Sequence, residues 1–231
     1  MKRKGYNEKR ETIIRAANNL FLKKGYEKTS VDEILLKISI SKGTFYHYFK
    51  SKIELLNVIL QEFSLAFVNK LKPFIEDKSL NPLKKLNAYF ELNQTMKSTN
   101  KNLFIDTINN FNKDENFIYY KKLNANLTNL LVPQMIKILQ YGRDEKIFQV
   151  ENIDENALLI INLGFTLRNT IIIELFKGQK NISSMTSLKK IEAHVDTYRI
   201  CFEKMLGLKK KSLILFKKGY FQQFLVKPKK K

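Results

Sequence analysis

The sequence predicts an all-α fold in which a small N-terminal domain of three helices precedes a larger helical domain. Apolar residues recur at intervals of three and four along nearly the whole chain, which is the spacing of one helix face. The 231 residues include eight glycines and four prolines, fewer turn residues than an all-β fold needs. With 44% hydrophobic residues the chain can bury a core, which excludes a disordered protein.

The chain is strongly basic, with 42 Lys and Arg against 22 Asp and Glu and a formal net charge of +20. The excess lies at the two ends. Residues 1–52 carry 13 basic and 5 acidic side chains, and residues 209–231 carry nine lysines and no acid. Such a basic balance is typical of proteins that bind a polyanion, either a nucleic acid or an anionic membrane surface.

The sequence carries no signature of a secreted, membrane-spanning or catalytic protein. No apolar run follows the basic first ten residues, and no stretch approaches the 18 or so apolar residues of a membrane span, so we expect a cytoplasmic protein. The single cysteine, Cys201, excludes an internal disulfide and a multi-thiolate metal site. The two histidines, His47 and His194, lie far apart, and no phosphate-binding or nucleophile motif is present. We expect no enzyme activity, no cofactor and no metal.

Capping residues place the first two helices. The first begins near Glu8 and ends at Gly25, which suits a left-handed cap. Ser30 and Glu33 form a capping box, which predicts that the second helix opens at about Val31.

Two further helices follow a break at residues 39–41. Ser41 caps a short helix over residues 42–49. A second capping box, Ser51 with Glu54, opens a long helix. This helix ends at Pro73 at the latest, because proline has no N–H for the helical ladder.

Helices in the second half of the chain are longer and less sharply bounded. Asn81 with Pro82 is typical of a cap followed by a proline in the first turn. Pro133 predicts a kink or a break, and Gly178 and Gly207 close the last two helices. The predicted helices cover residues 82–97, 101–112, 115–142, 154–176 (capped by Asp154) and 187–206 (capped by Ser187).

The helix, turn and short helix within residues 30–54 indicate a helix-turn-helix. Phe45 and Phe49 stand at i and i+4 of the short helix, so they share a face and should anchor it to the core. Lys50 and Lys52 lie at the N-terminus of the next helix, where backbone amides and lysine favour phosphate. The outer face of the short helix carries side chains that fit a DNA major groove: Lys42, Thr44, Tyr46 and His47.

Residues 11–56 resemble the N-terminal DNA-binding domain of the TetR family of transcriptional repressors. Leu131-Val132-Pro133 and the run to Phe148 resemble the central helices of that family more weakly. The resemblance implies an all-helical homodimer with an N-terminal reader of double-stranded DNA and a C-terminal domain that binds a small effector. The matching positions are Ala16-Ala17, Leu20-Phe21, Gly25-Tyr26, Thr29-Ser30-Val31, Ile34, Ser41 to Phe49 and Ser51 to Leu56.

The resemblance also implies domain boundaries and contact residues. It places a TetR-type domain at residues 8–68, with the helix-turn-helix at about 31–50, a helical effector-binding and dimerisation domain at 74–207, and a basic tail at 208–231. The implied DNA contacts are Thr29, Ser30, Lys42, Gly43, Thr44, Tyr46, His47, Lys50 and Lys52.

The turn departs from the family pattern. Where the family has Ala-Gly-Val, this chain has Ile38-Ser39-Ile40. If the turn needs a positive φ, Ser39 costs about 1 kcal/mol relative to glycine.

Arg168 is unusual in the larger domain because it falls within an apolar stripe of the helix that begins at Asp154. A charge in such a stripe needs a partner. It is either a rim or dimer-interface arginine, with its head in water or on a carboxylate, or an anchor for an anionic effector. The effector would be small and largely apolar. The other candidates for lining its cavity, for which an ordinary core position is the favoured alternative, are Phe104, Phe111, Tyr120 and Phe165.

The tail after Gly207 has no counterpart in the family pattern. Its apolar clusters at 213–216 and 220–226 alternate with lysines, which fits a disordered tail, a helix packed on the body, or an arm for DNA or an anionic membrane.

Taken together, the features of the whole sequence and the family resemblance favour a ligand-responsive repressor that binds a palindromic operator as a homodimer. Two alternatives stay open: an effector-independent DNA-organising protein on the same fold, and a membrane-surface protein that acts through its tail.

Overall fold

The computed structural model describes residues 2–99, 105, 108, 116–180 and 184–225. The described part is all-α and contains no strand, which confirms the predicted fold class. Its helices are α1 (Lys2–Lys24), α2 (Val31–Ile38), α3 (Lys42–Tyr48), α4 (Lys52–Glu76), α5 (Pro82–Thr99), α7 (Phe117–Asp144), α8 (Ile153–Lys180), α9 (Ser184–Met205) and α10 (Gln222–Leu225).

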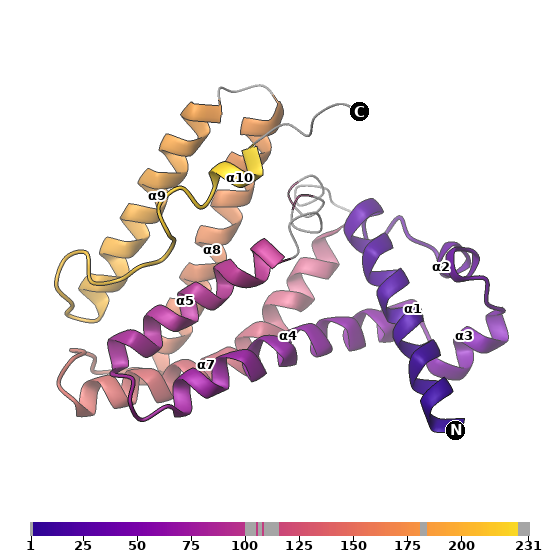
Figure 1. The fold of residues 1–231 in the computed structure, drawn as a ribbon, viewed down its shortest axis with the longest axis horizontal. Helices are drawn as coiled ribbons and strands as arrows, with labels where there is room; N and C mark the ends of the chain where they lie inside the picture. Colours follow the sequence, from indigo (N-terminus) through magenta and orange to yellow (C-terminus); the bar gives the residue numbers. More distant parts are fainter. Residues whose placement is uncertain (1, 100–104, 106–107, 109–115, 181–183, 226–231) are drawn as a thin grey trace.

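Two parts of the molecule are joined by one long helix. Figure 1 shows α1, α2 and α3 together at one end, here called the head, and α5, α7, α8 and α9 at the other, here called the body. Helix α4 begins in the head and runs into the body without a break. The boundary expected between residues 68 and 74 therefore falls inside a helix. A movement of α4 would displace residues in both the head and the body.

Local caps shape the head as the sequence predicts. The Ser30 hydroxyl accepts a bond from the backbone N of Glu33, and the Glu33 carboxylate accepts one from the backbone N of Ser30. Helix α2 ends at Ser39, which has φ of +53° and lies in the left-handed region. Gly25 likewise has a positive φ of +99° after α1. The unfavourable turn residue expected at Ser39 is thus present.

Helix α4 continues past Pro73 to Glu76, three residues beyond the predicted limit. A buried lysine from the next helix satisfies the carbonyl groups at its end. The Nζ atom of Lys85 lies 2.5 Å from the carbonyl oxygen of Ile75 and 2.6 Å from that of Asp77. A positive charge at a helix C-terminus is favourable, because the unpaired carbonyls carry partial negative charge.

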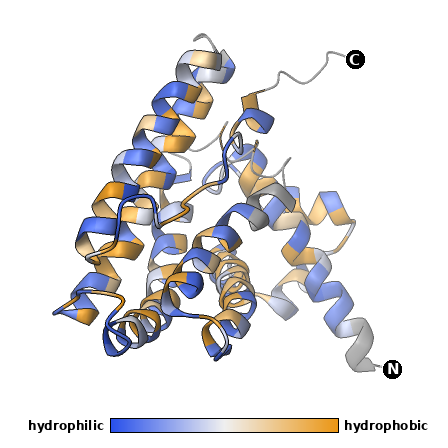
Figure 2. Cartoon of the chain, turned by 60° about the vertical axis from the view of Figure 1, so that its left-hand side comes forward, coloured by the Kyte–Doolittle hydropathy of each residue, from blue (hydrophilic) through white to orange (hydrophobic). Residues whose placement is uncertain are grey.

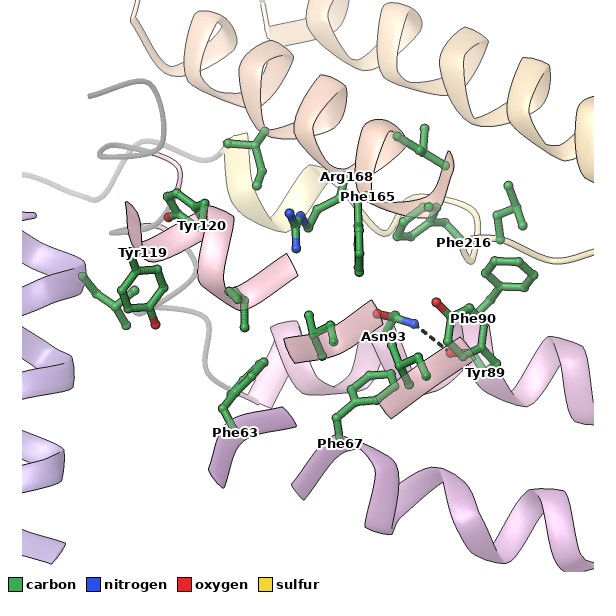
Figure 3. A pocket seen from close by; sticks show the side chains of 18 of the residues that line it. Phe63, Phe67, Tyr89, Phe90, Asn93, Tyr119, Tyr120, Phe165, Arg168 and Phe216 are labelled. Atoms are coloured by element: carbon green, nitrogen blue, oxygen red, sulfur yellow. Dashed lines mark hydrogen bonds between the residues drawn. The ribbon is translucent and has the colours of Figure 1, made fainter. Parts of the chain in front are cut away.

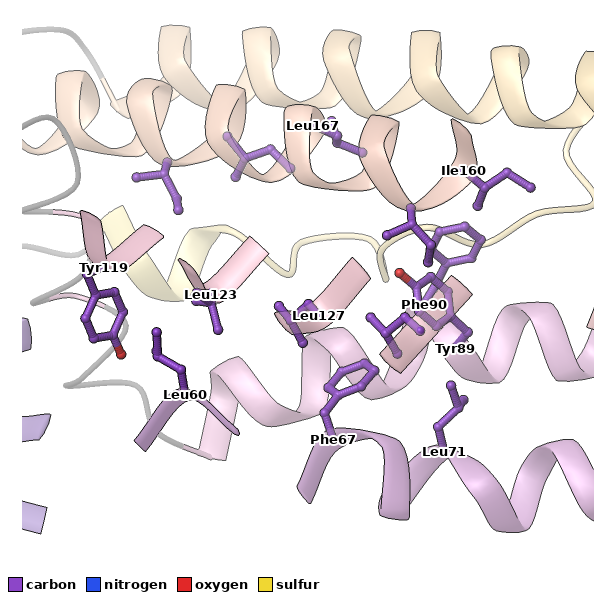
Figure 4. Close-up of a cluster of buried hydrophobic side chains, with 14 of the residues drawn as sticks. Leu60, Phe67, Leu71, Tyr89, Phe90, Tyr119, Leu123, Leu127, Ile160 and Leu167 are labelled. Atoms are coloured by element: carbon purple, nitrogen blue, oxygen red, sulfur yellow. The ribbon is translucent and has the colours of Figure 1, made fainter. Parts of the chain in front are cut away.

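The core of the body lies between α4, α5, α7 and α8. Figure 4 shows apolar side chains from these helices meeting in one cluster, and Figure 2 shows that each long helix has both hydrophobic and hydrophilic positions. Amphipathic helices of this kind bury one face and leave the other to water. The labelled members of the cluster are Leu60, Phe67, Leu71, Tyr89, Phe90, Tyr119, Leu123, Leu127, Ile160 and Leu167.

Two predicted boundaries in the body are wrong for a tertiary reason. Gly178 lies inside α8 and does not end it. A Cβ atom at this position would lie 2.7 Å from Leu225 and 2.9 Å from Ser187, so glycine allows α9 and α10 to pack closely against α8. Ser187, the predicted cap, lies inside α9 and is fully buried. Gly207 does follow α9 with a φ of +63°, as expected.

The segment after α9, residues 208–225, is here called the strap. It packs along the body and ends in the short helix α10 (Figure 1). Of the three interpretations of the tail, the packed one holds for these residues, although most of the strap is irregular. The buried side chains of the strap are Leu213, Leu215, Phe221, Phe224 and Leu225.

Helix α8 has one property that the sequence interpretation missed. Within the described residues, its stretch 153–179 is long and apolar enough to cross a membrane by length and composition, with a mean hydropathy of 1.5. Core helices of soluble proteins meet the same test, so this is weak evidence. Here α8 packs against both α7 and α9.

Candidate DNA-binding surface and ligand pocket

Helix α3 is held by two phenylalanines and presents its other side to solvent. Phe45 and Phe49 are buried, with exposed fractions of 0% and 1%. Lys42, Gly43, Tyr46 and His47 are exposed, and 53% of the Tyr46 surface is accessible. The predicted anchoring face and the predicted outer face are therefore both present. An exposed helix of this size fits the major groove of B-DNA.

Two groups on α3 already have protein partners. The Nζ atom of Lys42 lies 3.0 Å from a carboxylate oxygen of Asp32 on α2, and this pairing raises the pKa of Lys42. Both side chains are exposed, so the pair is weak and its lysine can exchange Asp32 for a DNA group. The Thr44 hydroxyl lies 3.0 Å from the hydroxyl of Ser41, the cap of α3. Thr44 thus supports the first turn of the helix.

Thr29 and Ser30 have structural roles that the DNA interpretation did not include. Thr29 is fully buried, and its hydroxyl donates a 2.7 Å hydrogen bond to the carbonyl oxygen of Gly25. Its side chain holds the turn between α1 and α2, so the expected side-chain contact of Thr29 with DNA does not fit the structure. Ser30 is exposed, and its hydroxyl caps α2.

Lys50 and Lys52 differ in their surroundings: Lys50 is exposed, and Lys52 has partners within the head. The Nζ atom of Lys52 donates to the carbonyl oxygens of Tyr26 at 2.9 Å and Thr29 at 3.0 Å, and it lies 4.3 Å from the centre of the Tyr26 ring. Its ammonium group is turned into the head rather than outward to a phosphate. Lys50 is exposed, and its backbone N donates to Glu54. Of the two lysines, the exposed Lys50 is the one whose side chain is available for a phosphate contact.

The sequence interpretation missed one aromatic contact to α3. Helix α1 begins at Lys2, six residues before the predicted start, and carries Tyr6 next to α3. The Tyr6 ring lies 4.5 Å from that of Tyr48 and meets the His47 ring edge-on at 5.6 Å. Tyr6 thereby brings the N-terminal part of α1 beside α3. No local feature of the sequence predicted this contact, because it joins residues that are distant in the chain.

A pocket of about 440 Å³ opens in the body, a volume within the usual range of small-molecule sites. Figure 3 shows aromatic side chains from several helices around it. Its lining residues are Asn18, Leu22, Phe63, Phe67, Tyr89, Phe90, Asn93, Tyr119, Tyr120, Leu123, Leu127, Leu131, Gly164, Phe165, Leu167, Arg168, Ile172, Phe202, Leu215 and Phe216.

Three of the five predicted effector residues line this pocket: Tyr120, Phe165 and Arg168. Phe104 and Phe111 lie outside the described residues. The sequence interpretation missed the contributions of α1, α4 and the strap, because these segments are distant in sequence. Phe216 of the strap is an example, since nothing local indicates that a tail residue returns to the body.

Arg168 extends from α8 into the pocket between α7 and the Phe165 ring (Figure 3). Its Nη2 atom donates to Oδ1 of Asn124 at 2.8 Å and to Oδ1 of Asn169 at 3.2 Å. The guanidinium carbon lies 5.2 Å from the centre of the Phe165 ring. Burial disfavours the charged form and lowers the pKa of Arg168 to about 10, so the group is still a cation at neutral pH.

The pocket is in contact with the head. Phe63 and Phe67 of α4 and Asn18 of α1 line it. The Tyr119 hydroxyl donates to Oδ1 of Asn18 at 3.3 Å, which links α7 to α1. A second link is buried, where the backbone N of Tyr26 donates to Oδ1 of Asn116 at 3.1 Å. The pocket lining and the head are thus joined by hydrogen bonds between α7 and the segment of α1 and its following turn.

Comparison with known proteins agrees with this architecture. Residues 13–59 match the family "Bacterial regulatory proteins, tetR family". The chain is 41% identical over 80 residues to the uncharacterised HTH-type transcriptional regulator YerO of Bacillus subtilis, covering 35% of this chain and 28% of YerO. It is 31% identical over 81 residues to the HTH-type transcriptional repressor DhaR of a Mycobacterium species, covering 35% of this chain and 41% of DhaR.

Residues 13–59 therefore form a domain of the TetR DNA-binding type. The matches span less than half the length of these curated relatives. Solved structures extend the likeness of the fold to the body. The Bacillus subtilis regulator FadR in complex with stearoyl-CoA has a TM-score of 0.59 at 22% identity, over 80% of this chain and 97% of FadR. Reduced Escherichia coli NemR has a TM-score of 0.57 at 18% identity, over 81% and 96%.

Proposed function

We propose that this protein is a ligand-responsive transcriptional repressor that binds a palindromic DNA operator as a homodimer. A small, largely apolar effector binds in the pocket and releases the DNA. The observation that carries the proposal is the continuity of α4, which begins directly after the recognition helix and lines the pocket with Phe63 and Phe67. A ligand that favours a different position of α4 would change the orientation of α3.

Dimerisation is proposed through α8 and α9. Leu158, Leu159 and Ile200 lie on the outer sides of these helices with exposed fractions of 37%, 49% and 39%. Exposed apolar residues on two adjacent helices favour a protein interface. A two-fold dimer would set its two α3 helices about 34–36 Å apart, which matches one turn of DNA.

The pocket favours this function over an effector-independent DNA-organising protein, which has no need of an apolar cavity in its body. FadR in complex with stearoyl-CoA supports the view that a protein of this fold can hold a ligand with a long acyl chain. A membrane role for the tail is less favoured, because the apolar residues of the strap are buried against the body. In this proposal the protein acts in the cytoplasm and catalyses no reaction.

DNA binding can be tested by fluorescence anisotropy, with DNA from the region flanking the gene and random DNA of equal length. Tyr46→Ala should weaken binding to the specific DNA by about 1–3 kcal/mol, because the exposed ring is lost from the recognition helix. Phe74→Ala is the matched control, since Phe74 is an exposed aromatic at the far end of α4. Unchanged affinity of Tyr46→Ala at fixed salt would show that α3 is not the reading helix.

The dimer can be tested by sedimentation at micromolar concentration. The wild-type chain should sediment as a dimer, and Leu159→Glu should shift it toward the monomer, because a buried unpaired charge destabilises an interface. A monomeric wild-type mass would contradict the proposed assembly.

A further inference from the structure

The lining of the pocket is largely apolar and carries its charge at one point. Its walls are apolar and aromatic, with a few amide and hydroxyl groups. Among its described lining residues, Arg168 is the one side chain with a formal charge. Most of the surface can therefore accept a hydrocarbon or aromatic body, and a single point carries a positive charge.

The guanidinium group of Arg168 has neutral partners. Its hydrogen bonds go to the side-chain oxygens of Asn124 and Asn169, and none of the ion pairs among the described residues includes it. An arginine carries five N–H donors in a planar fork that matches a carboxylate. Two amide oxygens orient the fork, but they do not neutralise its charge.

The position of Arg168 also separates the two interpretations of this residue. Asn124 belongs to α7, and Phe165, whose ring faces the guanidinium, also lines the pocket. The charged group is thus directed between α7 and α8 and away from the outer sides of α8 and α9. A role at a dimer interface of α8 and α9 would require the opposite direction.

We propose that the pocket binds an apolar molecule with a single carboxylate, and that Arg168 holds the carboxylate. The inference rests on the proposed function only in using the same pocket for the effector. A carboxylate on the guanidinium fork gains two charge-assisted hydrogen bonds in a site that excludes much of the water. One cation and one anion then balance within the apolar walls.

The same balance of charge disfavours other head groups on the ligand. A cation would repel Arg168 at close range, where screening by water is weak. A head with several phosphates would bring more negative charge than one arginine can compensate, which is costly away from water. A neutral alcohol can bond to the guanidinium but leaves its charge unbalanced. The ligand class is therefore the monocarboxylate.

The test uses three probes of equal chain length, namely decanoate, decan-1-ol and decyltrimethylammonium, titrated calorimetrically into the full-length chain. Wild-type protein should bind decanoate at least tenfold more tightly than decan-1-ol and should bind the cation more weakly than either. Arg168→Met should remove the preference for decanoate over the alcohol, and Arg168→Lys should keep part of it. Lys70→Met, which removes an exposed charge from α4, should behave as wild type.

Equal binding of decanoate and decan-1-ol by the wild-type chain would overturn the proposal, as would an undiminished preference in folded Arg168→Met. If Arg168→Met does not fold, the wild-type comparison and Arg168→Lys still decide. DNA affinity is measured separately on the same preparations. A chain that prefers decanoate through Arg168 but does not bind DNA refutes the repressor function and leaves the ligand class standing.

Discussion

The head and the body each contain a long cationic side chain that turns inward, and the two differ in what receives the charge. In the head, Lys52 donates to the backbone carbonyl oxygens of residues 26, 27 and 29 in the turn between α1 and α2. In the body, Arg168 donates to side-chain amides of Asn124 and Asn169 and faces a pocket.

The difference distinguishes a cation that stabilises the fold, Lys52, from a cation that faces a possible ligand, Arg168. Lys52 adds a charged donor to carbonyl oxygens of the turn, one of which, that of Tyr26, also accepts from the backbone N of Thr29 at 3.3 Å. Side-chain amides are adjustable, and the guanidinium keeps donor capacity toward the pocket. The burial that lowers the pKa of Arg168 also means that an anion placed beside it is weakly screened. The same charge thus stabilises the fold in one region and selects a ligand in the other.

The largest effect on stability is expected at Gln94. This buried amide of the body, like Lys52 in the head, bonds to backbone groups of a segment distant in sequence. Gln94 is 4% exposed; its Nε2 atom donates to the carbonyl oxygen of Leu215 at 3.2 Å, and its Oε1 accepts from the backbone N of Lys217 at 2.9 Å. Gln94→Ala leaves two strap groups without these partners and should lower the free energy of unfolding by about 2–3 kcal/mol. Chemical denaturation measures it.

The matched control for this change is Gln140→Ala, because Gln140 is exposed on α7. It should change stability by less than about 0.5 kcal/mol. Equal stability of both variants would mean that the strap is not held by Gln94. In that case the pocket wall formed by Leu215 and Phe216 would need another explanation.

A smaller effect tests whether Lys52 is structural. Lys52→Ala should lower the free energy of unfolding by about 1–2 kcal/mol, because turn carbonyls lose a charged donor. It should leave the salt dependence of DNA binding nearly unchanged. Lys50→Ala should do the reverse, with unchanged stability and a salt slope lower by about one, as for the loss of one phosphate contact. A reduced slope for Lys52→Ala would restore the phosphate role expected from the family resemblance.

The smallest effect concerns the turn of the head. Ser39→Gly should raise the free energy of unfolding by up to about 1 kcal/mol, because glycine adopts the left-handed conformation without a Cβ clash. Lys37→Gly in the last turn of α2 is the control and should destabilise, since glycine weakens a helix. Loss of stability in Ser39→Gly would show that the hydroxyl-bearing residue contributes more than its strained backbone costs.

Much of the head could be predicted because its signals are short in range. The bond between Ser30 and Glu33 spans three residues, and a positive φ at Gly25 needs only the glycine itself. In the body, the apolar stripe of α8 correctly marks Arg168 as unusual. The local rules fail at Pro73, because a lysine twelve residues later supports the end of α4. They fail again at Gly178, where the absence of a side chain serves close packing.

The sequence by itself determined the all-α fold, the helix-turn-helix and the outer face of α3, since helical periodicity and caps act over three or four residues. Only the tertiary structure decided the direction of long side chains and the fate of the tail. Lys52 is drawn inward by carbonyls that lie 23–26 residues earlier, and the strap meets Gln94 across more than 120 residues. Such partners leave no periodic trace, because they depend on which surfaces meet when the helices pack.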